Sequence, residues 1–249
     1  MILSKVFKEL AFSILDKSKF RGFHLFRDLR FYASQFNLPV ETIFDVGANI
    51  GQTSKELRRY FPDSSIHAFE PINSTFEILK ENLCEDQKII LNNFALGAEE
   101  KEVIISLRDE NLINSLLNEI NPTNQDVLIS DRNYQNYQTQ AIKVSQGDKY
   151  CSVNNINSAF LLKTDTEGYD LDVLKGFDKK IIEREIFFIL VEVTFDNTDL
   201  SHTSFARVNE YLASHGYNLS GFYDLIHRGG LLPNLYYCNC LWSSLAIKK

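Results

Sequence analysis

The sequence predicts an α/β protein built on a Rossmann-like, mostly parallel sheet of seven strands, with helices on both faces and an antiparallel final strand. Three observations lead to this prediction. Residues 43–60 read as a short apolar strand, a glycine-containing turn and a helix, as in the first unit of such a sheet. Further apolar runs alternate with helical patterns, as in repeated βα units. Residues 186–193 are apolar almost throughout, as expected for a parallel strand buried on both faces.

Composition restricts the classes of protein to consider. The 249 residues are enough for one full hydrophobic core. The net charge of −7 argues against a nucleic-acid partner, because such binding depends on neutralising phosphates. No stretch approaches the ~20 consecutive apolar residues of a membrane span, and residues 1–20 lack the continuous apolar core of a signal peptide. We therefore expect a cytoplasmic protein without a transmembrane segment.

Residues 1–40 are predicted to form a helical extension ahead of one main domain, residues 41–249. Apolar side chains recur in the extension at helical intervals, and lysines and arginines make it basic within an acidic protein. Two interpretations stay open for it. It is either a helix that contacts a membrane surface or a partner, or a helical cap packed on the edge of the sheet.

The turn after the first strand carries Asp45, Gly47, Asn49 and Gly51. Its spacing differs from the G-x-G-x-x-G loop that receives a dinucleotide pyrophosphate. The two glycines allow a tight turn and close approach of a ligand, and the helix that follows points free N–H groups at that ligand. Asp45 would repel phosphate, but it suits the amino and sulfonium groups of S-adenosylmethionine (SAM). The turn therefore predicts SAM as the cofactor.

Glu70 supports this prediction. It ends the second apolar run, residues 66–69, at the spacing where a carboxylate binds both ribose hydroxyls of a nucleoside. The alternative is a structural turn with a solvated acid.

Five motifs together resemble the FkbM-type methyltransferase family, and they occur in that family's order. They are DVGANIG at 45–51, FEP at 69–71, NNFALG at 92–97, LLKTDTEGYDLDVLKGF at 161–177 and ILVEV at 189–193. The resemblance implies a class I, SAM-dependent methyltransferase fold. It also implies O-methylation of a hydroxyl on a sugar, glycan or natural-product acceptor. One departure is Ser145-Gln146-Gly147-Asp148, where the family usually has T-L-D.

Asn93 and Ala95 follow the third strand, residues 88–92, where class I methyltransferases receive the adenine ring. An amide side chain there can form hydrogen bonds with the adenine edge. The alternative is that Asn93 is an ordinary turn asparagine.

The catalytic candidates are Lys163, Asp165 and Glu167, which alternate at the end of the strand 159–163 and should point to one side. An acid there can act as the general base for an acceptor hydroxyl, and Lys163 can stabilise a developing alkoxide. The alternative is a structural acid near a helix start with Lys163 as its ion-pair partner. His202 is a weaker base candidate, because a lone loop histidine is usually incidental.

Glu192 could complete a set of three carboxylates with Asp165 and Glu167 near the ends of adjacent strands. Such a set can in principle hold Mg²⁺, but this ion demands near-octahedral geometry that carboxylate proximity does not establish. We therefore predict a route without a metal.

Residues 109–139 are polar and irregular and lie between strands near the edge where ligands bind. We predict that they form a lid or a substrate-recognition segment. Two other functions compete with methyl transfer. The D-V-G-A-N turn argues against a nicotinamide-dependent oxidoreductase, and the intact K-x-D-x-E-G run argues against a scaffold or SAM-binding protein that has lost catalysis.

Overall fold

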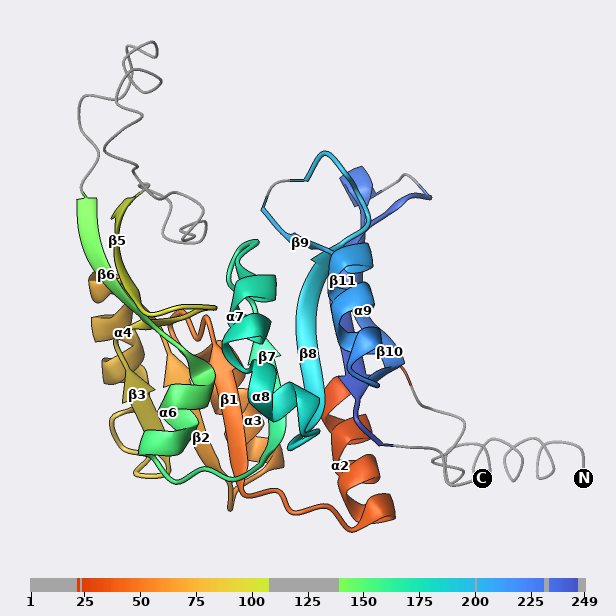
Figure 1. Cartoon of the computed structure of the whole chain (residues 1–249), viewed down its shortest axis with the longest axis horizontal. Coiled ribbons are helices and arrows are strands. Elements are labelled where there is room, and N and C mark those ends of the chain that lie inside the picture. The colour runs from red at the N-terminus through yellow and green to blue at the C-terminus, as the bar shows by residue number, and fades with distance from the viewer. Residues whose placement is uncertain (1–21, 23, 108–138, 200, 231–232, 246–249) are drawn as a thin grey trace, which may run out of the picture.

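The computed structural model of the chain describes residues 22, 24–107, 139–199, 201–230 and 233–245 (Figure 1). Its central sheet has the strand order β10-β11-β8-β7-β1-β2-β3, and the two-residue β9 also pairs with β8. The strands are β1 (Thr42–Val46), β2 (Ser65–Phe69), β3 (Ile89–Asn92), β7 (Ala159–Thr164), β8 (Ile186–Thr194), β9 (Thr203–Ser204), β10 (Asn218–His227) and β11 (Leu235–Ser243).

The five strands β3, β2, β1, β7 and β8 are parallel to one another. The last strand, β11, runs antiparallel between β8 and β10. The prediction of a mostly parallel α/β sheet with an antiparallel final strand is therefore confirmed. Residues 45 of β1 and 163 of β7 lie opposite each other in register, which brings two distant parts of the sequence together.

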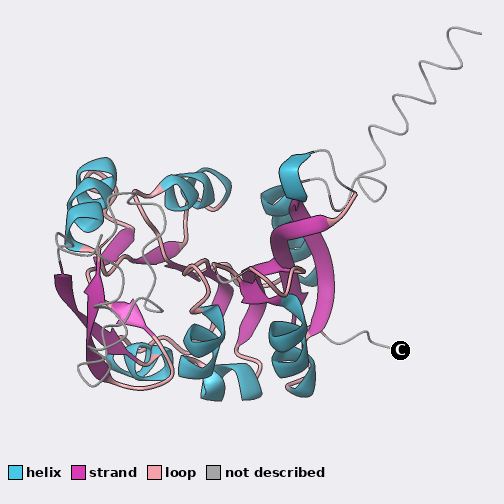
Figure 2. Ribbon diagram, turned by 90° about the horizontal axis from the view of Figure 1, so that it is seen from above, coloured by secondary structure: helices cyan, strands magenta, loops and turns pink. Residues whose placement is uncertain are grey.

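Helices cover both faces of this sheet (Figure 2). One face packs against α2 (Leu25–Phe36), α3 (Gln52–Tyr60) and α4 (Asn73–Leu83). The other packs against α6 (Gly147–Val153), α7 (Asp170–Gly176), α8 (Asp178–Ile182) and α9 (Phe205–Ser214). Because strand residues alternate between the two faces, Ile43 and Phe44 enter different cores. The two cores hold the carboxyl ends of the strands in place.

A second, smaller sheet contains the strands predicted around the polar segment. It consists of β4 (Ala95–Leu96), β5 (Lys101–Ser106) and β6 (Thr139–Ser145), with β6 between the other two. Gln140 on β6 accepts a hydrogen bond from the Asn73 backbone N–H and donates one to the Pro71 carbonyl. This sheet is thereby tied to the turn after β2. The predicted lid, residues 109–139, lies outside the described residues except for its last one.

The described part of the amino-terminal extension packs on the sheet. Leu25 and Leu29 of α2 are buried, and the Tyr32 ring stacks on Phe188 of β8. The Asp28 carboxylate accepts hydrogen bonds from the Gly22 N–H and from the Tyr223 hydroxyl. Helix α2 therefore matches the description of a helical cap, whereas the predicted membrane contact concerns mainly residues 1–21, which are not described. Every helix in the described ranges is too short or too polar to cross a bilayer.

Candidate active site

The glycine turn after β1 is shaped by the packing of the protein itself. Gly47 and Gly51 have φ values of +75° and +92°, and Asn49 between them has a φ of +49°. A Cβ atom at Gly47 would lie 1.9 Å from the Asp165 carbonyl oxygen, which is a direct overlap with backbone. One at Gly51 would lie 2.9 Å from atoms of Leu79 and Leu83. We expected these glycines to make room for a ligand. Gly47 is already required by the close approach of the Asp165 carbonyl, and Gly51 is favoured by its positive φ beside two leucine side chains.

Glu70 fixes the other side of this turn. Its Oε2 accepts a hydrogen bond of 3.1 Å from the Asn49 N–H, and its Oε1 accepts one of 2.9 Å from the Ile72 N–H. The side chain is 7 % exposed. Burial raises the pKa of Glu70 to about 7, although the two N–H donors act in the opposite direction. Each carboxylate oxygen keeps a lone pair for another donor, so the group can bind a further hydroxyl.

Asp45 and Lys163 form a buried ion pair below the turn. The Asp45 Oδ2 accepts a hydrogen bond of 2.6 Å from the Ser54 hydroxyl, and its Oδ1 lies 3.2 Å from the Lys163 Nζ. The same Nζ donates to the Gly47 carbonyl at 3.2 Å and lies 3.5 Å from Asp165 Oδ2. Burial alone would lower the pKa of Lys163, but the Asp45 and Asp165 carboxylates raise it above its ordinary value. Lys163 is therefore a fixed ammonium that joins β1, β7 and the turn.

A cavity of about 220 Å³ opens beside this ion pair. Lys163 and Asp165 line one side of it, and Thr53 and Glu56 from the first turns of α3 line another. Residues from the start of α2 and from β8, β10 and β11 complete its wall. The end of β7 and the start of the helix that follows the glycine turn therefore line the same cavity.

Asn93 and Ala95 both make contacts within the fold itself. The Asn93 amide donates to the carbonyls of Glu70 at 3.0 Å and Pro71 at 3.4 Å. Ala95 is buried in the core of the small sheet with Ile72 and Val103. The Asn93 contacts match the alternative of a turn asparagine, and its amide holds the segment that carries Glu70.

Asp170 organises the acidic turn at the end of β7, and sequence reasoning did not single it out. It is 1 % exposed. Its Oδ1 accepts hydrogen bonds from the Thr164 hydroxyl at 2.7 Å and from the backbone N–H and hydroxyl of Thr166 at 3.0 and 2.9 Å. Its Oδ2 accepts one of 2.9 Å from the Thr203 hydroxyl. Asp170 therefore joins the turn that carries Asp165 to the loop that follows β8.

Glu167 lies within this turn with a φ of +52°, a backbone conformation that side chains other than glycine rarely adopt. Its carboxyl is half-buried. Burial, followed by the negative charge of Asp165, raises the pKa of Glu167 to about 7. A carboxylate with a pKa near the working pH is suited to general base catalysis. Strain and a shifted pKa in one residue are typical of functional positions.

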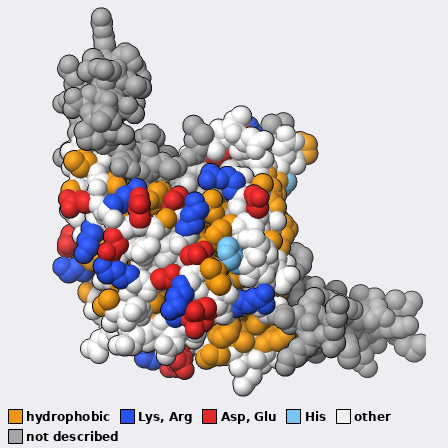
Figure 3. All heavy atoms as spheres, viewed as in Figure 1, with side chains coloured by type: hydrophobic (Ala, Val, Ile, Leu, Met, Phe, Trp, Pro, Cys, Tyr) orange, Lys and Arg blue, Asp and Glu red, His pale blue; other side chains and the backbone are white. Residues whose placement is uncertain are grey.

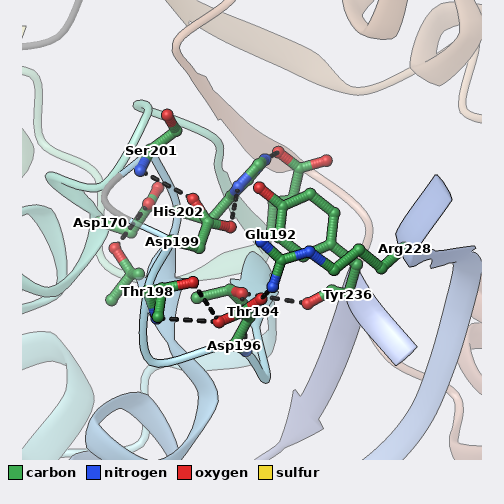
Figure 4. Close-up of polar contacts among 11 residues, drawn as sticks. Asp170, Glu192, Thr194, Asp196, Thr198, Asp199, Ser201, His202, Arg228 and Tyr236 are labelled. Atoms are coloured by element: carbon green, nitrogen blue, oxygen red, sulfur yellow. Dashed lines mark hydrogen bonds and ion pairs between the residues drawn. The ribbon is translucent and has the colours of Figure 1, made fainter. Parts of the chain in front are cut away.

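His202 lies between two carboxylates, as Figure 4 shows. Its Nδ1 is 2.7 Å from the Asp199 Oδ2, and its Nε2 is 3.2 Å from the Glu192 Oε2. The ring stacks on Tyr237 at 4.3 Å between centroids. Burial alone would lower the pKa of His202, but the hydrogen bonds to Glu192 and Asp199 raise it to about 9. Sequence reasoning treated this histidine as a lone loop residue and missed its partners. The only signal was the spacing of Asp199 three residues earlier.

Charged side chains of both signs lie on the face of the molecule that Figure 3 shows. On the face shown in Figure 3, acidic and basic side chains are interspersed. The exclusion of a nucleic-acid partner stays a prediction. Within the described residues, His, Cys, Asp and Glu side chains form no group of three or more that could hold a metal ion. Asp165, Glu167 and Glu192 therefore do not make such a group.

Several known proteins are similar to this chain, to different extents. A curated relative, Methyltransferase 1 of Beauveria bassiana (strain ARSEF 2860), is 30 % identical over 145 residues, which are 55 % of this chain and 58 % of that protein. The chain thus matches a little over half the length of this relative.

Two solved structures share the general arrangement of the fold. TrmK of M. capricolum, solved with S-adenosyl-homocysteine, has a TM-score of 0.41 at 11 % identity, over 86 % of this chain and 68 % of that one. Precorrin-6y C5,15-methyltransferase of Geobacter metallireducens GS-15 has a TM-score of 0.44 at 12 % identity, over 86 % of both chains. These likenesses are too distant to carry an argument about function.

The match to a protein family is much more extensive. The methyltransferase FkbM domain matches residues 45–219, which begin at the acidic residue of the glycine turn and end in β10. The matched segment includes Glu70, the acidic turn after β7 and the His202 loop. The chain therefore belongs to the FkbM methyltransferase family.

Proposed function

We propose that this protein is a SAM-dependent methyltransferase that methylates a hydroxyl oxygen of a sugar, glycan or natural-product acceptor. The observation that carries the proposal is the Glu70 carboxylate, which binds the backbone of the glycine turn through the Asn49 N–H and still has lone pairs for ribose hydroxyls. The residues proposed to hold SAM are Asp45, Gly47, Asn49, Gly51, Glu70, Asn93 and Ala95. When bound, SAM supplies an electrophilic methyl group.

The described residues fit a ligand that carries both hydroxyls and a positive charge. Three carboxylates lie at adjacent strand ends: Asp45 on β1, Glu70 after β2 and Asp165 after β7. The buried Asp45 Oδ1 lacks a hydrogen-bond partner among the described residues, although Lys163 lies 3.2 Å away as its counterion. The cavity is lined by Asp165 and by Lys163, the counterion of Asp45. A pyrophosphate would meet repulsion from the same acids, which disfavours a nicotinamide cofactor.

Each catalytic candidate has a distinct role in this proposal. Glu167 removes the proton from the acceptor hydroxyl, because its raised pKa makes it the better base. The proton leaves the acceptor oxygen and ends on the Glu167 carboxylate. Asp165 orients the acceptor. Lys163 has acceptors in Asp45, Asp165 and Gly47, so it holds the site together and acts less directly on a developing alkoxide.

The experiment that tests the proposal is calorimetric titration of the purified protein with SAM and with NADH. We expect SAM to bind and NADH not to bind. The opposite result would contradict the proposal in favour of an oxidoreductase. With an acceptor found by screening sugars and glycosides, release of S-adenosylhomocysteine should persist in EDTA. Loss of activity in EDTA and its recovery with Mg²⁺ would overturn the part of the proposal that omits a metal.

A further inference from the structure

The loop after β8 fixes the position of His202 through contacts with three other parts of the fold. The backbone of Thr203, the next residue, pairs with Val193 of β8 through β9. The Thr203 hydroxyl donates to Asp170, which anchors the loop to the acidic turn after β7. The ring itself stacks on Tyr237 of β11 with an interplanar angle of 16°. His202 is therefore held from β8, β11 and the β7 turn at once, and its orientation is set by the fold.

Both ring nitrogens face carboxylate oxygens. Asp199 is on the Nδ1 side and Glu192 on the Nε2 side. The Asp199 side chain is 2 % exposed, and its Oδ1 also accepts a hydrogen bond of 2.9 Å from the Ser201 N–H. An ionised carboxylate can only accept hydrogen bonds. With Asp199 and Glu192 both ionised, both ring nitrogens carry a proton, which is the imidazolium state that these two carboxylates favour by raising the pKa of His202.

Glu192 is the partner of His202 whose charge acts on the acidic turn. Its charge is among the causes that raise the pKa of Glu167, after burial and Asp165. Like charges placed close together resist simultaneous ionisation. Burial raises the pKa of Glu192, whereas the hydrogen bond and the charge of His202 lower it. Without this cation, Glu192 would compete more strongly with Glu167 for a proton. The groups that act on His202 and Glu192 from neighbouring elements are Asp165, Glu167, Asp170, Asp199, Tyr236 and Tyr237.

We propose that His202 is a positioning residue, an imidazolium clamped by Asp199 that keeps Glu192 ionised and oriented beside Glu167 in the acceptor site. This inference rests on the proposed function. Glu192 then only accepts a hydrogen bond from the molecule that is methylated. Glu167 remains the group that removes the proton from the hydroxyl of that molecule. The acceptor must accordingly present hydrogen-bond donors to two carboxylates, as a polyhydroxylated or amino-bearing molecule does.

The test is nuclear magnetic resonance of the full chain with isotope-labelled histidine and glutamate side chains. At about pH 7.5 we expect both His202 nitrogens to be protonated. In Asp199→Asn the His202 titration midpoint should fall by about one pH unit or more, since an opposite charge close by shifts a pKa by about 1–3 units. In His202→Gln the Glu192 carboxyl midpoint should rise by a similar amount. His215→Gln, which removes a histidine directly after α9 that contacts the Tyr211 carbonyl, is the matched control and should change neither midpoint.

A neutral His202 ring at about pH 7.5, or a Glu192 midpoint unchanged by His202→Gln, would overturn the inference. SAM calorimetry on the same samples separates it from the proposed function. If the wild type binds no SAM, the proposed function fails regardless of the His202 result. If His202→Gln binds SAM as tightly as wild type while the Glu192 midpoint rises, both stand, because the variant is folded and only the acceptor side has changed.

Discussion

The two ends of the candidate site are built in different ways. The cofactor side, defined as Asp45, Gly47, Asn49 and Glu70, depends mainly on backbone groups of the turns after β1 and β2, and its central contact joins residues 21 positions apart. The acceptor side, defined as Glu167, Glu192, Asp199 and His202, depends on contacts between side chains from separate loops, among them the Asp170–Thr203 bond that spans 33 positions. A site formed by backbone groups tolerates few substitutions in the turn that carries them. In a site formed by side chains, single side chains can be substituted without unfolding the protein.

The largest expected effect is on the cofactor side. Gly47→Ala should lower the free energy of unfolding by at least about 4 kcal/mol, because the new Cβ would overlap the Asp165 carbonyl and φ is positive. Gly229→Ala is the matched control, since φ is also positive there but no atom of the described residues would lie within 4 Å of the new Cβ. It should cost only about 1–2 kcal/mol. Urea denaturation measures both. Equal losses would show that the overlap with Asp165 does not matter.

Glu167→Gln should have the largest effect on the acceptor side. With a found acceptor and saturating SAM, kcat should fall about 100- to 10,000-fold, because the general base is lost. The free energy of unfolding should change little. Asp172→Asn, on a half-buried position of α7, is a control that should keep most of the activity. A Glu167→Gln variant that retains full turnover would remove this residue from the proposed chemistry.

Asp170→Ala tests whether Asp170 holds together the two segments that carry the acceptor side. Asp170 accepts hydrogen bonds from Thr164, Thr166 and Thr203, and hydrogen bonds to a charged group contribute about 1.5–3 kcal/mol each, although they are not additive. We expect a loss of about 2–3 kcal/mol in urea denaturation. We also expect faster hydrogen exchange in the loop that carries Ser201 and Thr203. A stable variant with an unchanged loop would mean that these hydrogen bonds do not join the two segments.

A further expected change is in the dependence of turnover on pH. The pKa of Glu167 is raised to about 7, so its base form is present above that pH and is lost below it. Turnover at saturating SAM should therefore rise about tenfold per pH unit up to about pH 7 and then level off. It should fall again near pH 9, where His202 loses its proton. The His202→Gln variant should lack the second change. A profile that is flat between about pH 5 and 8 would contradict the assignment of Glu167.

The same difference explains what could be predicted from the sequence. The positions of the strands along the chain follow from apolar runs and turns that are local, and the Glu70 position follows from its spacing after Gly47. The Lys163–Asp45 ion pair could not be predicted as a contact, because it depends on β1 and β7 being neighbours in register. The partners of His202 were missed for a similar reason. Glu192 precedes it by ten residues on a strand that only the folded loop brings back to it.

Glycine positions show a second limit of sequence reasoning. Gly47 and Gly51 were correctly identified as special, but their nearest neighbours are Asp165, Leu79 and Leu83. A pattern of glycines reveals a constraint on the backbone without naming the atoms that impose it. A Gly47 variant that fails to bind SAM therefore cannot distinguish loss of the ligand site from loss of the turn. Changes in carboxylates give the cleaner test.

The central claim is that cofactor binding and acceptor chemistry belong to separate sides of one site. The most direct measurement is calorimetric SAM titration of Glu70→Gln beside Glu167→Gln, with the fold of both checked by urea denaturation. We expect Glu70→Gln to weaken binding about 10- to 100-fold, equivalent to about 1.5–3 kcal/mol for hydrogen bonds to a charged group. Glu167→Gln should bind SAM within about twofold of wild type, since the proposal gives it no cofactor contact. Equal weakening in the two variants, or none in Glu70→Gln, would contradict the claim.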